Sequence, residues 1–209
     1  MYLPPHFAVT DPEALHQLMQ AHPWGALITC GEGAGCQPPA VRVRWGAGAH
    51  GCCGPMWPAT TPLAGGERRR RGAGDLPRRR GLYLPSWYPG KQVHHQQVPT
   101  WNYAVVHAHG RIRVRDDARF VRRLLATLTR THEAGESIPW KMADAPRDYL
   151  ETMVQAVVGI EIEIERLVGK FKLGQNKEAA DRLGAANALQ ERGQTALAGA
   201  MLNPPPSQS

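Results

Sequence analysis

The sequence predicts an α+β fold, because stretches with strand periodicity and stretches with helix periodicity both occur along the chain. Residues 100–114 and 160–169 alternate apolar and polar side chains, which is the period of two that a half-buried strand shows. Residues 10–21 and 117–131 instead repeat apolar side chains every three or four positions after a capping residue, as amphipathic helices do. Both kinds of element are therefore expected in one fold.

The length of 209 residues suits a single domain. We expect that domain to span residues 1–192, with a flexible tail at 193–209 that ends in NPPPSQS.

Local signals define the amino-terminal elements. Asp11 can cap a helix, and Pro12 suits the first turn of that helix, which runs to about residue 21. An apolar strand is expected at residues 24–30. The side chains that face the core from the helix are Leu15, Leu18 and Met19.

Three further helices are expected after the long strand. The first begins after Asp117 and runs to about residue 131, with arginines on its polar face. The second begins at residues 144–146 and ends near 158, and the third spans 177–192 with Asn176 as its cap. The expected packing residues are Phe120, Val121, Leu124, Leu125 and Leu128 on the first and Tyr149, Leu150, Met153, Val154 and Val157 on the second.

Residues 82–116 are the stretch around which the chain is organised. A short apolar strand at 82–84 leads into a Pro/Gly/His-rich loop and then into the strand at 100–114, in which Gly110 allows a bend or bulge. Aromatic, amide and lysine side chains in such a loop suit a planar, polar and anionic ligand. The alternative is a barrel corner whose aromatic side chains plug one end. The residues concerned are Trp87, Tyr88, Lys91, His94, His95, Thr100, Trp101 and Asn102.

The same loop carries a family resemblance. SWYP at 86–89 and VPTWNY at 98–103 resemble the PaiB family of FMN-binding negative transcriptional regulators. MYLPPHF at 1–7, HPWGALIT at 22–29 and the stretch at 139–177 resemble other parts of that family. The resemblance implies a split β-barrel related to the pyridoxamine-phosphate-oxidase-like flavin-binding folds. It also implies a homodimer with FMN at the subunit interface.

The net charge of +7 is concentrated in one segment. Residues 38–81 hold nine arginines and two acidic residues, which accounts for the whole excess, while the rest of the chain has 16 basic and 16 acidic residues. The total charge is therefore a weak argument for a nucleic-acid partner.

Residues 33–81 are anomalous, because they are rich in Gly, Pro and Arg and show no sustained period. One interpretation is a disordered basic insertion. The other is translation out of frame: with allowed synonymous codons, shifted phases of residues 36–45, 54–62 and 72–78 can encode AANHLPFEFDG, AHVARNNP and ALVIFQG. These strings resemble three family segments in the same order. In related split barrels, the region equivalent to HVARNNP holds the flavin phosphate, and the sequence as written lacks it.

The resemblance and the side-chain chemistry together indicate a set of candidate FMN-binding residues. Trp87 and Tyr88 are expected to pack or stack, and Thr100, Trp101 and Asn102 to contact the ring edge. Lys141, Lys172 and Gln175 are expected at the phosphate or the dimer seam. Gly174 replaces the serine of the family signature KFKLSQN, which removes one hydroxyl.

The function expected from these features is that of an FMN-binding transcriptional regulator, dimeric and cytoplasmic, for which DNA contact rests on the resemblance alone. The alternatives are a flavin-dependent oxidoreductase on the same split-barrel fold and a non-catalytic binding module that has lost flavin. No catalytic acid–base pair, metal site, disulfide among the four cysteines or membrane span is expected. Any chemistry would then belong to the cofactor.

Overall fold

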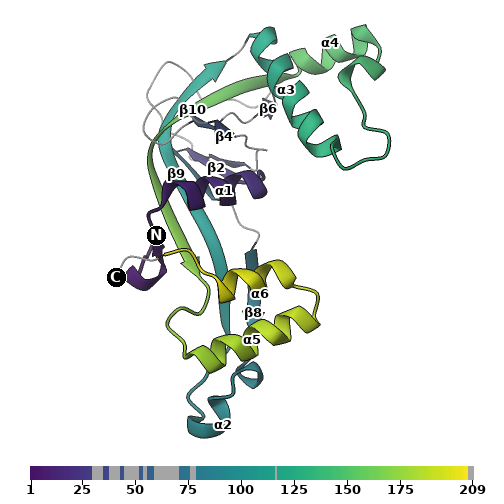
Figure 1. The fold of residues 1–209 in the computed structure, drawn as a ribbon. Coiled ribbons are helices and arrows are strands. Elements are labelled where there is room, and N and C mark those ends of the chain that lie inside the picture. The colour runs from purple at the N-terminus through teal and green to yellow at the C-terminus, as the bar shows by residue number, and fades with distance from the viewer. Residues whose placement is uncertain are drawn as a thin grey trace. The chain divides into compact units, whose positions relative to one another are not determined.

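The computed structural model describes residues 1–29, 79–115 and 117–206, together with the short strands at 35–37, 43–44, 52–53, 56–58 and 71–75. The chain forms two compact units (Figure 1). The first unit comprises residues 1–22, 75–107 and 167–209, and the second comprises 23–74 and 108–166.

Ten strands of the described residues pair in the order β3-β2-β7-β9-β10-β5-β4, with β1 and β6 also on β10 and β8 on β9. The longest two strands, β9 and β10, contribute residues to both units. The strands are β1 (Ala8–Val9), β2 (Ala26–Thr29), β3 (Gly35–Gln37), β4 (Val43–Arg44), β5 (Cys52–Cys53), β6 (Met56–Pro58), β7 (Arg71–Asp75), β8 (Arg79–Tyr83), β9 (Thr100–Arg115) and β10 (Val157–Lys172).

The helices occur before, between and after the two long strands along the sequence. They are α1 (Pro12–Ala21), α2 (Lys91–His94), α3 (Ala118–Glu133), α4 (Arg147–Gln155), α5 (Ala179–Glu191) and α6 (Thr195–Leu202), with 3-10 turns η1 (Pro5–Phe7), η2 (Pro85–Trp87) and η3 (Met142–Asp144). The α+β composition expected from the periodicities is therefore present.

Two predicted helix starts are confirmed at atomic detail. The Asp11 carboxylate accepts hydrogen bonds from the backbone N–H groups of Glu13 and Ala14 at 3.1 and 3.2 Å. Asp117 accepts one from Phe120 N–H at 2.7 Å and so begins α3. These bonds satisfy N–H groups that have no partner within the helix. The stripe of Leu15, Leu18 and Met19 is buried as expected, and His16 is buried with it.

Three local expectations were wrong. Helix α4 ends at Gln155, because the strand periodicity of β10 already begins at Val157. Of its expected packing face, Val154 is buried but Tyr149 and Met153 are exposed, since α4 contacts α3 along a narrow line. Asn176 is exposed in the turn after β10 and does not cap α5, whose N-cap residue is Glu178.

The segment expected to be a flexible tail begins instead with helix α6. Leu197, Ala198 and Met201 of this helix are buried. Helix α6 packs beside α5 and against β8 within the first unit (Figure 1). A Cβ on Gly81 of β8 would lie only 2.8 Å from Leu197 Cδ2, so glycine permits this close contact. Residues 203–206 follow the helix, and 207–209 lie outside the described residues.

The anomalous segment contributes five short strands, β3 to β7, which its residue pattern did not predict. Strand β5 pairs with β10 and β4, and β6 pairs with β10, all antiparallel. The side chains of these strands lie outside the described residues. Both interpretations of residues 33–81, a basic insertion and an out-of-frame stretch, concern a segment most of which lies outside the described residues.

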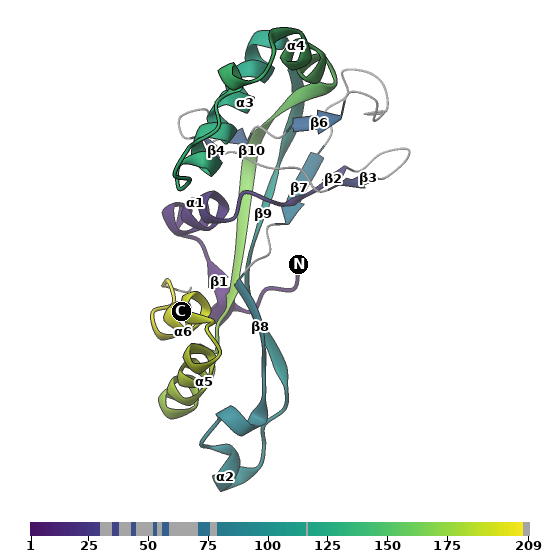
Figure 2. The ribbon, with the colours of Figure 1, turned by 90° about the vertical axis from the view of Figure 1, so that its right-hand side faces the viewer.

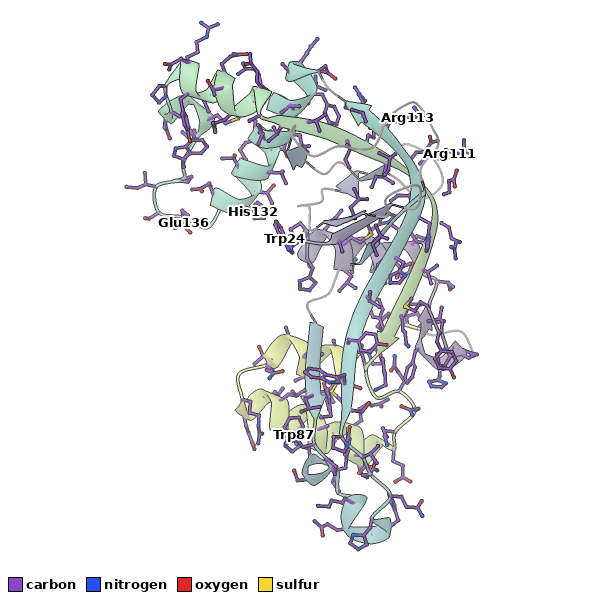
Figure 3. The ribbon with its side chains drawn as sticks, turned by 180° about the vertical axis from the view of Figure 1, so that it is seen from behind. Trp24, Trp87, Arg111, Arg113, His132 and Glu136 are labelled. Carbon is purple, nitrogen blue, oxygen red and sulfur yellow. The ribbon has the colours of Figure 1, made fainter. Side chains whose placement is uncertain are left out.

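In the second unit, β9 and β10 are joined by a ladder of ion pairs. Arg111, Arg113 and Arg115 on β9 pair with Glu165, Glu163 and Glu161 on β10 at 2.5, 2.8 and 3.0 Å. Figure 3 shows Arg111 and Arg113 projecting from β9. The apolar cluster of this unit comprises Leu27, Ile160 and Ile162, with Ile112 and Val158 packed against them.

Gly110 lies where the backbones of β9 and β10 come closest. A Cβ at this position would lie 2.1 Å from the carbonyl oxygen of Glu163, which no side chain can tolerate without a shift of the backbone. The predicted role of Gly110 in shaping this strand thus has a steric reason.

We predict that Gly110→Ala lowers the free energy of unfolding by about 1–3 kcal/mol, because the methyl group forces β9 away from β10. The matched control is Gly199→Ala on α6, where nothing lies within 4 Å of the added Cβ. That change should raise stability by up to about 1 kcal/mol, because alanine favours a helix over glycine. Urea unfolding measures both, and equal effects would contradict the steric explanation.

Candidate functional site

The candidate site lies in the first unit, where the start of β9 meets the end of β10. Lys172, the last residue of β10, donates hydrogen bonds from Nζ to Thr100 Oγ1 at 2.6 Å and to the Trp101 carbonyl oxygen at 2.5 Å. The Trp101 side chain is 53% exposed and lies in register with Leu82 on the neighbouring strand β8. Three of the predicted residues, Thr100, Trp101 and Lys172, therefore meet at one place. The Lys172 ammonium is held there by the Thr100 hydroxyl and by the backbone of Trp101.

Two further lysines lie close enough to Lys172 to affect its charge, and each is held by neutral groups. Lys170 is buried, and its Nζ donates to the Tyr2 carbonyl oxygen at 2.9 Å while lying 5.4 Å from the centre of the Tyr103 ring. Lys177 donates to Gln97 Oε1 at 2.6 Å and lies 5.5 Å from the centre of the Tyr88 ring. We call Lys170, Lys172 and Lys177 the lysine cluster.

The lysine cluster has no anionic partner in the described part of the chain, where every ion pair involves arginine. Burial lowers the pKa of Lys172, and the positive charges of Lys170 and Lys177 lower it further. Like charges held together without a counter-ion oppose one another. An anionic ligand would relieve this repulsion and accept charge-assisted hydrogen bonds.

Hydrogen bonds hold the loop between β8 and β9 against helix α5. The buried Asp181 carboxylate accepts hydrogen bonds from Gly90 N–H at 2.7 Å and from Gln97 Nε2 at 2.8 Å. Gly184 on the same helix lets the loop approach, since a Cβ there would lie 2.6 Å from the Trp87 carbonyl oxygen. Figure 2 shows β8 and β9 running as a hairpin with α2 at its tip.

Trp87 and Tyr88 pack within this loop. Trp87 is half-buried beside α5, with the Arg192 guanidinium 4.7 Å from its ring centre and the Tyr83 ring edge-on at 5.8 Å (Figure 3). Tyr88 is buried, and that burial, reinforced by the nearby charge of Asp181, raises its pKa. In this conformation both aromatic side chains serve packing.

The other predicted residues are placed differently. Asn102 is buried near Tyr83, and among the described residues its amide nitrogen Nδ2 has no hydrogen-bond partner. Burial raises the pKa of Tyr83. The Gln175 amide is used within its own turn, accepting from Leu173 N–H at 2.8 Å and donating to the Phe171 carbonyl oxygen at 2.6 Å. Lys141 belongs to the second unit and is exposed, so it is not part of the cluster.

Gly174 explains one departure from the family signature. Its φ of +84° is a backbone conformation that glycine adopts without strain. A Cβ there would lie 3.6 Å from Asn102 Nδ2, so a serine hydroxyl would fall near this buried amide.

Sequence reasoning missed Gln97, Lys177 and Asp181 as parts of the site. Asp181 and Gly90 lie 91 positions apart, so no local pattern joins them. Lys177 offered one signal, since it follows the GQN end of the β10 motif that already supplied Lys172. The described residues hold no group of three or more His, Cys, Asp or Glu side chains arranged to bind a metal. No helix in the same part of the chain combines the length and apolar character that crossing a membrane requires.

We predict that Lys172 titrates below the ordinary lysine value of 10.5, because burial and its charged neighbours disfavour the ammonium form. Lys170→Met removes one of those charges, so the pKa of Lys172 should move upward. Lys91→Met, on α2 outside the cluster, should leave it unchanged. NMR titration of the lysine side chains measures these pKa values. An unchanged pKa of Lys172 in the Lys170 variant would refute the electrostatic coupling between the two lysines.

Comparison with known proteins places the chain in a family. Residues 1–46 and 82–166 match the family described as "Putative FMN-binding domain", and the match is interrupted within the anomalous segment. The Bacillus subtilis protein "Protease synthase and sporulation protein PAI 2" is 24% identical over 200 residues, which cover 91% of this chain and 89% of that protein. An uncharacterized protein of Emericella nidulans is 37% identical over 105 residues, covering 46% of this chain and 42% of the relative. The chain thus aligns with less than half the length of that fungal relative.

Solved structures show the same fold at low identity. The FAD and heme binding protein from Mycobacterium smegmatis is 15% identical with a TM-score of 0.57, covering 80% of this chain and 74% of its own. The conserved hypothetical protein Rv2991 from Mycobacterium tuberculosis is 12% identical with a TM-score of 0.55, covering 82% of this chain and 91% of its own. The shared fold is the split β-barrel, so the predicted α+β split barrel is confirmed. The chain therefore belongs to the FMN-binding domain family as a member of the PaiB type, and FMN is the cofactor that this membership assigns to it.

Proposed function

We propose that this chain is an FMN-binding negative transcriptional regulator of the PaiB type that acts as a cytoplasmic homodimer. The observation that carries the proposal is the lysine cluster, which has no anionic partner among the described residues and lies in the same unit as the exposed Trp101. The alignment with the Bacillus subtilis protein over nine-tenths of both chains supports the PaiB assignment. DNA is the partner that a regulator requires, and this part of the proposal rests on the family resemblance.

The residues of the site fit the two ends of FMN. Lys172 and Thr100 suit the phosphate, because the Lys172 ammonium is held in place and no carboxylate of the described residues pairs with it. Trp101, the next residue along β9, suits the flat ring, because its aromatic side chain is exposed. The phosphate ligands of related split barrels are missing from the sequence as written, so the lysine cluster would have to replace them.

The remaining predicted residues take supporting roles in this proposal. Trp87, Tyr88 and Asn102 shape the loop and the start of β9 from the interior. Gln175 holds the turn after β10, and Lys141 is assigned to the dimer seam. When bound, FMN supplies the redox chemistry, and the protein supplies binding and orientation.

The competing function is that of a flavin-dependent oxidoreductase on the same fold. The deciding experiment uses the purified full chain, identifies the flavin that it binds, and then adds NADH or NADPH without oxygen but with ferricyanide as the electron acceptor. A regulator should bind FMN, form a dimer by light scattering, and not turn over either nicotinamide. Multiple turnovers would establish the oxidoreductase instead. If the chain binds no flavin, that result would contradict both of these functions. The remaining alternative would be a non-catalytic binding module that has lost flavin.

We predict that Trp101→Ala lowers the affinity for FMN about tenfold, because the flavin ring loses an aromatic contact worth about 1 kcal/mol or more. Riboflavin, which has the same ring, should lose affinity equally. Trp24→Ala is the matched control, because Trp24 is a similarly exposed tryptophan of the second unit. Flavin fluorescence titration measures all three proteins. Unchanged FMN affinity in the Trp101 variant would remove this residue from the site.

A further inference from the structure

Gln97 joins an acidic residue to a basic one without letting them pair. Its Nε2 donates to Asp181 Oδ2 at 2.8 Å, and its Oε1 accepts from Lys177 Nζ at 2.6 Å. Asp181 also accepts from Gly90 N–H, so both of its carboxylate oxygens have hydrogen-bond donors. The neutral amide of Gln97 holds Lys177 in place and keeps it from a direct ion pair with Asp181.

Lys177 and Lys172 are held by the same short stretch of chain. Gln97 binds the first ammonium group, and Thr100 and the Trp101 carbonyl bind the second. An ammonium group has three donors. Lys177 gives one of them to Gln97, and Lys172 gives one to each of its two partners. Both lysines therefore retain a donor for a ligand at the entry to β9.

The ligand that suits two such lysines is a dianion with several acceptor oxygens. A phosphate monoester has this charge and these oxygens, whereas a carboxylate carries a single charge. Lys170, although buried, adds a third positive charge to the same unit. Together the three lysines favour the more highly charged ligand.

We propose that Lys177 is a second anion-binding residue that acts with Lys172 on a phosphate monoester, and that Gln97 and Asp181 are the residues that position it. This proposal rests on the proposed function where the phosphate is that of FMN. A free phosphate compound is the other source of the same chemistry, and the experiment separates the two.

The experiment compares FMN, riboflavin and inorganic phosphate as ligands of the full chain in phosphate-free buffer. Lys177→Met should lower the affinity for FMN about tenfold and change the affinity for riboflavin less than about twofold. Riboflavin lacks the phosphate that Lys177 is proposed to contact. Lys177→Arg keeps the charge and should preserve most of the preference for FMN. Lys91→Met, in the same loop but outside the cluster, should change neither affinity.

Gln97→Glu gives a second and independent variant. The new carboxylate would lie where Oε1 now accepts from Lys177, so it would neutralise that lysine and repel Asp181. The ratio of FMN to riboflavin affinity should fall as in Lys177→Met. A residue that only stabilises the loop would weaken both flavins equally, and that result in both variants would overturn the proposal.

Inorganic phosphate distinguishes this proposal from the proposed function. Competition between phosphate and FMN in the native chain, lost in Lys177→Met, supports the phosphate of FMN as the ligand. The native chain could instead bind phosphate through Lys177 but bind no flavin. That result would contradict the proposed function and support the anion site, with a free phosphate compound as its ligand. Flavin binding that is indifferent to Lys177 and to phosphate would refute the anion site alone.

Discussion

The antiparallel pairing of β9 with β10 is the constraint on which the rest of the structure depends. Each strand contributes residues to both units, so their register determines which side chains meet in each. The ion-pair ladder is exposed, and each such pair contributes at most about 1 kcal/mol. Burying isoleucine side chains such as Ile160 and Ile162 contributes more, about 1.5–3 kcal/mol each. A slip of one residue would expose these side chains and turn the charged ones inward, so the alternation sets the register.

The lysine cluster illustrates a conflict between stability and binding. The three ammonium groups have no carboxylate partner among the described residues. Burial lowers the pKa of Lys172, and repulsion from Lys170 and Lys177 lowers it further, so the ligand-free chain bears a free-energy cost there. Four neutral groups from two parts of the chain hold them: the Tyr2 carbonyl, and the Gln97 amide, the Thr100 hydroxyl and the Trp101 carbonyl at the entry to β9. An acidic residue in place of Gln97 or Thr100 would stabilise a lysine and weaken an anion site. The lack of a carboxylate partner among the described residues is therefore the property that points to a ligand.

Elements with strong local signals could be predicted from the sequence. Asp11 and Asp117 begin helices because capping is a local interaction, and the alternation of residues 100–114 appears in β9. Helix α6 was missed because its Ala-rich residues show little amphipathic pattern and its burial depends on α5 and β8. The contact of Asp181 with the loop was missed for a related reason, since it joins residues 91 positions apart. Residues 33–81 show neither helix capping signals nor strand alternation, and the family match is interrupted between residues 46 and 82.

The origin of the lysine cluster in distant parts of the chain has a consequence for biosynthesis. Lys170 is anchored by residue 2, Lys177 by residue 97, and the loop by residue 181. A ribosome releases these segments in order, and the last of them emerges only when nearly the whole chain has been made. A nascent chain cannot hold the cluster together, and contacts between residues so far apart form slowly. Under the proposed function, loading of FMN at the lysine cluster therefore follows translation, and the supply of free FMN to the finished chain decides how much of the protein carries it.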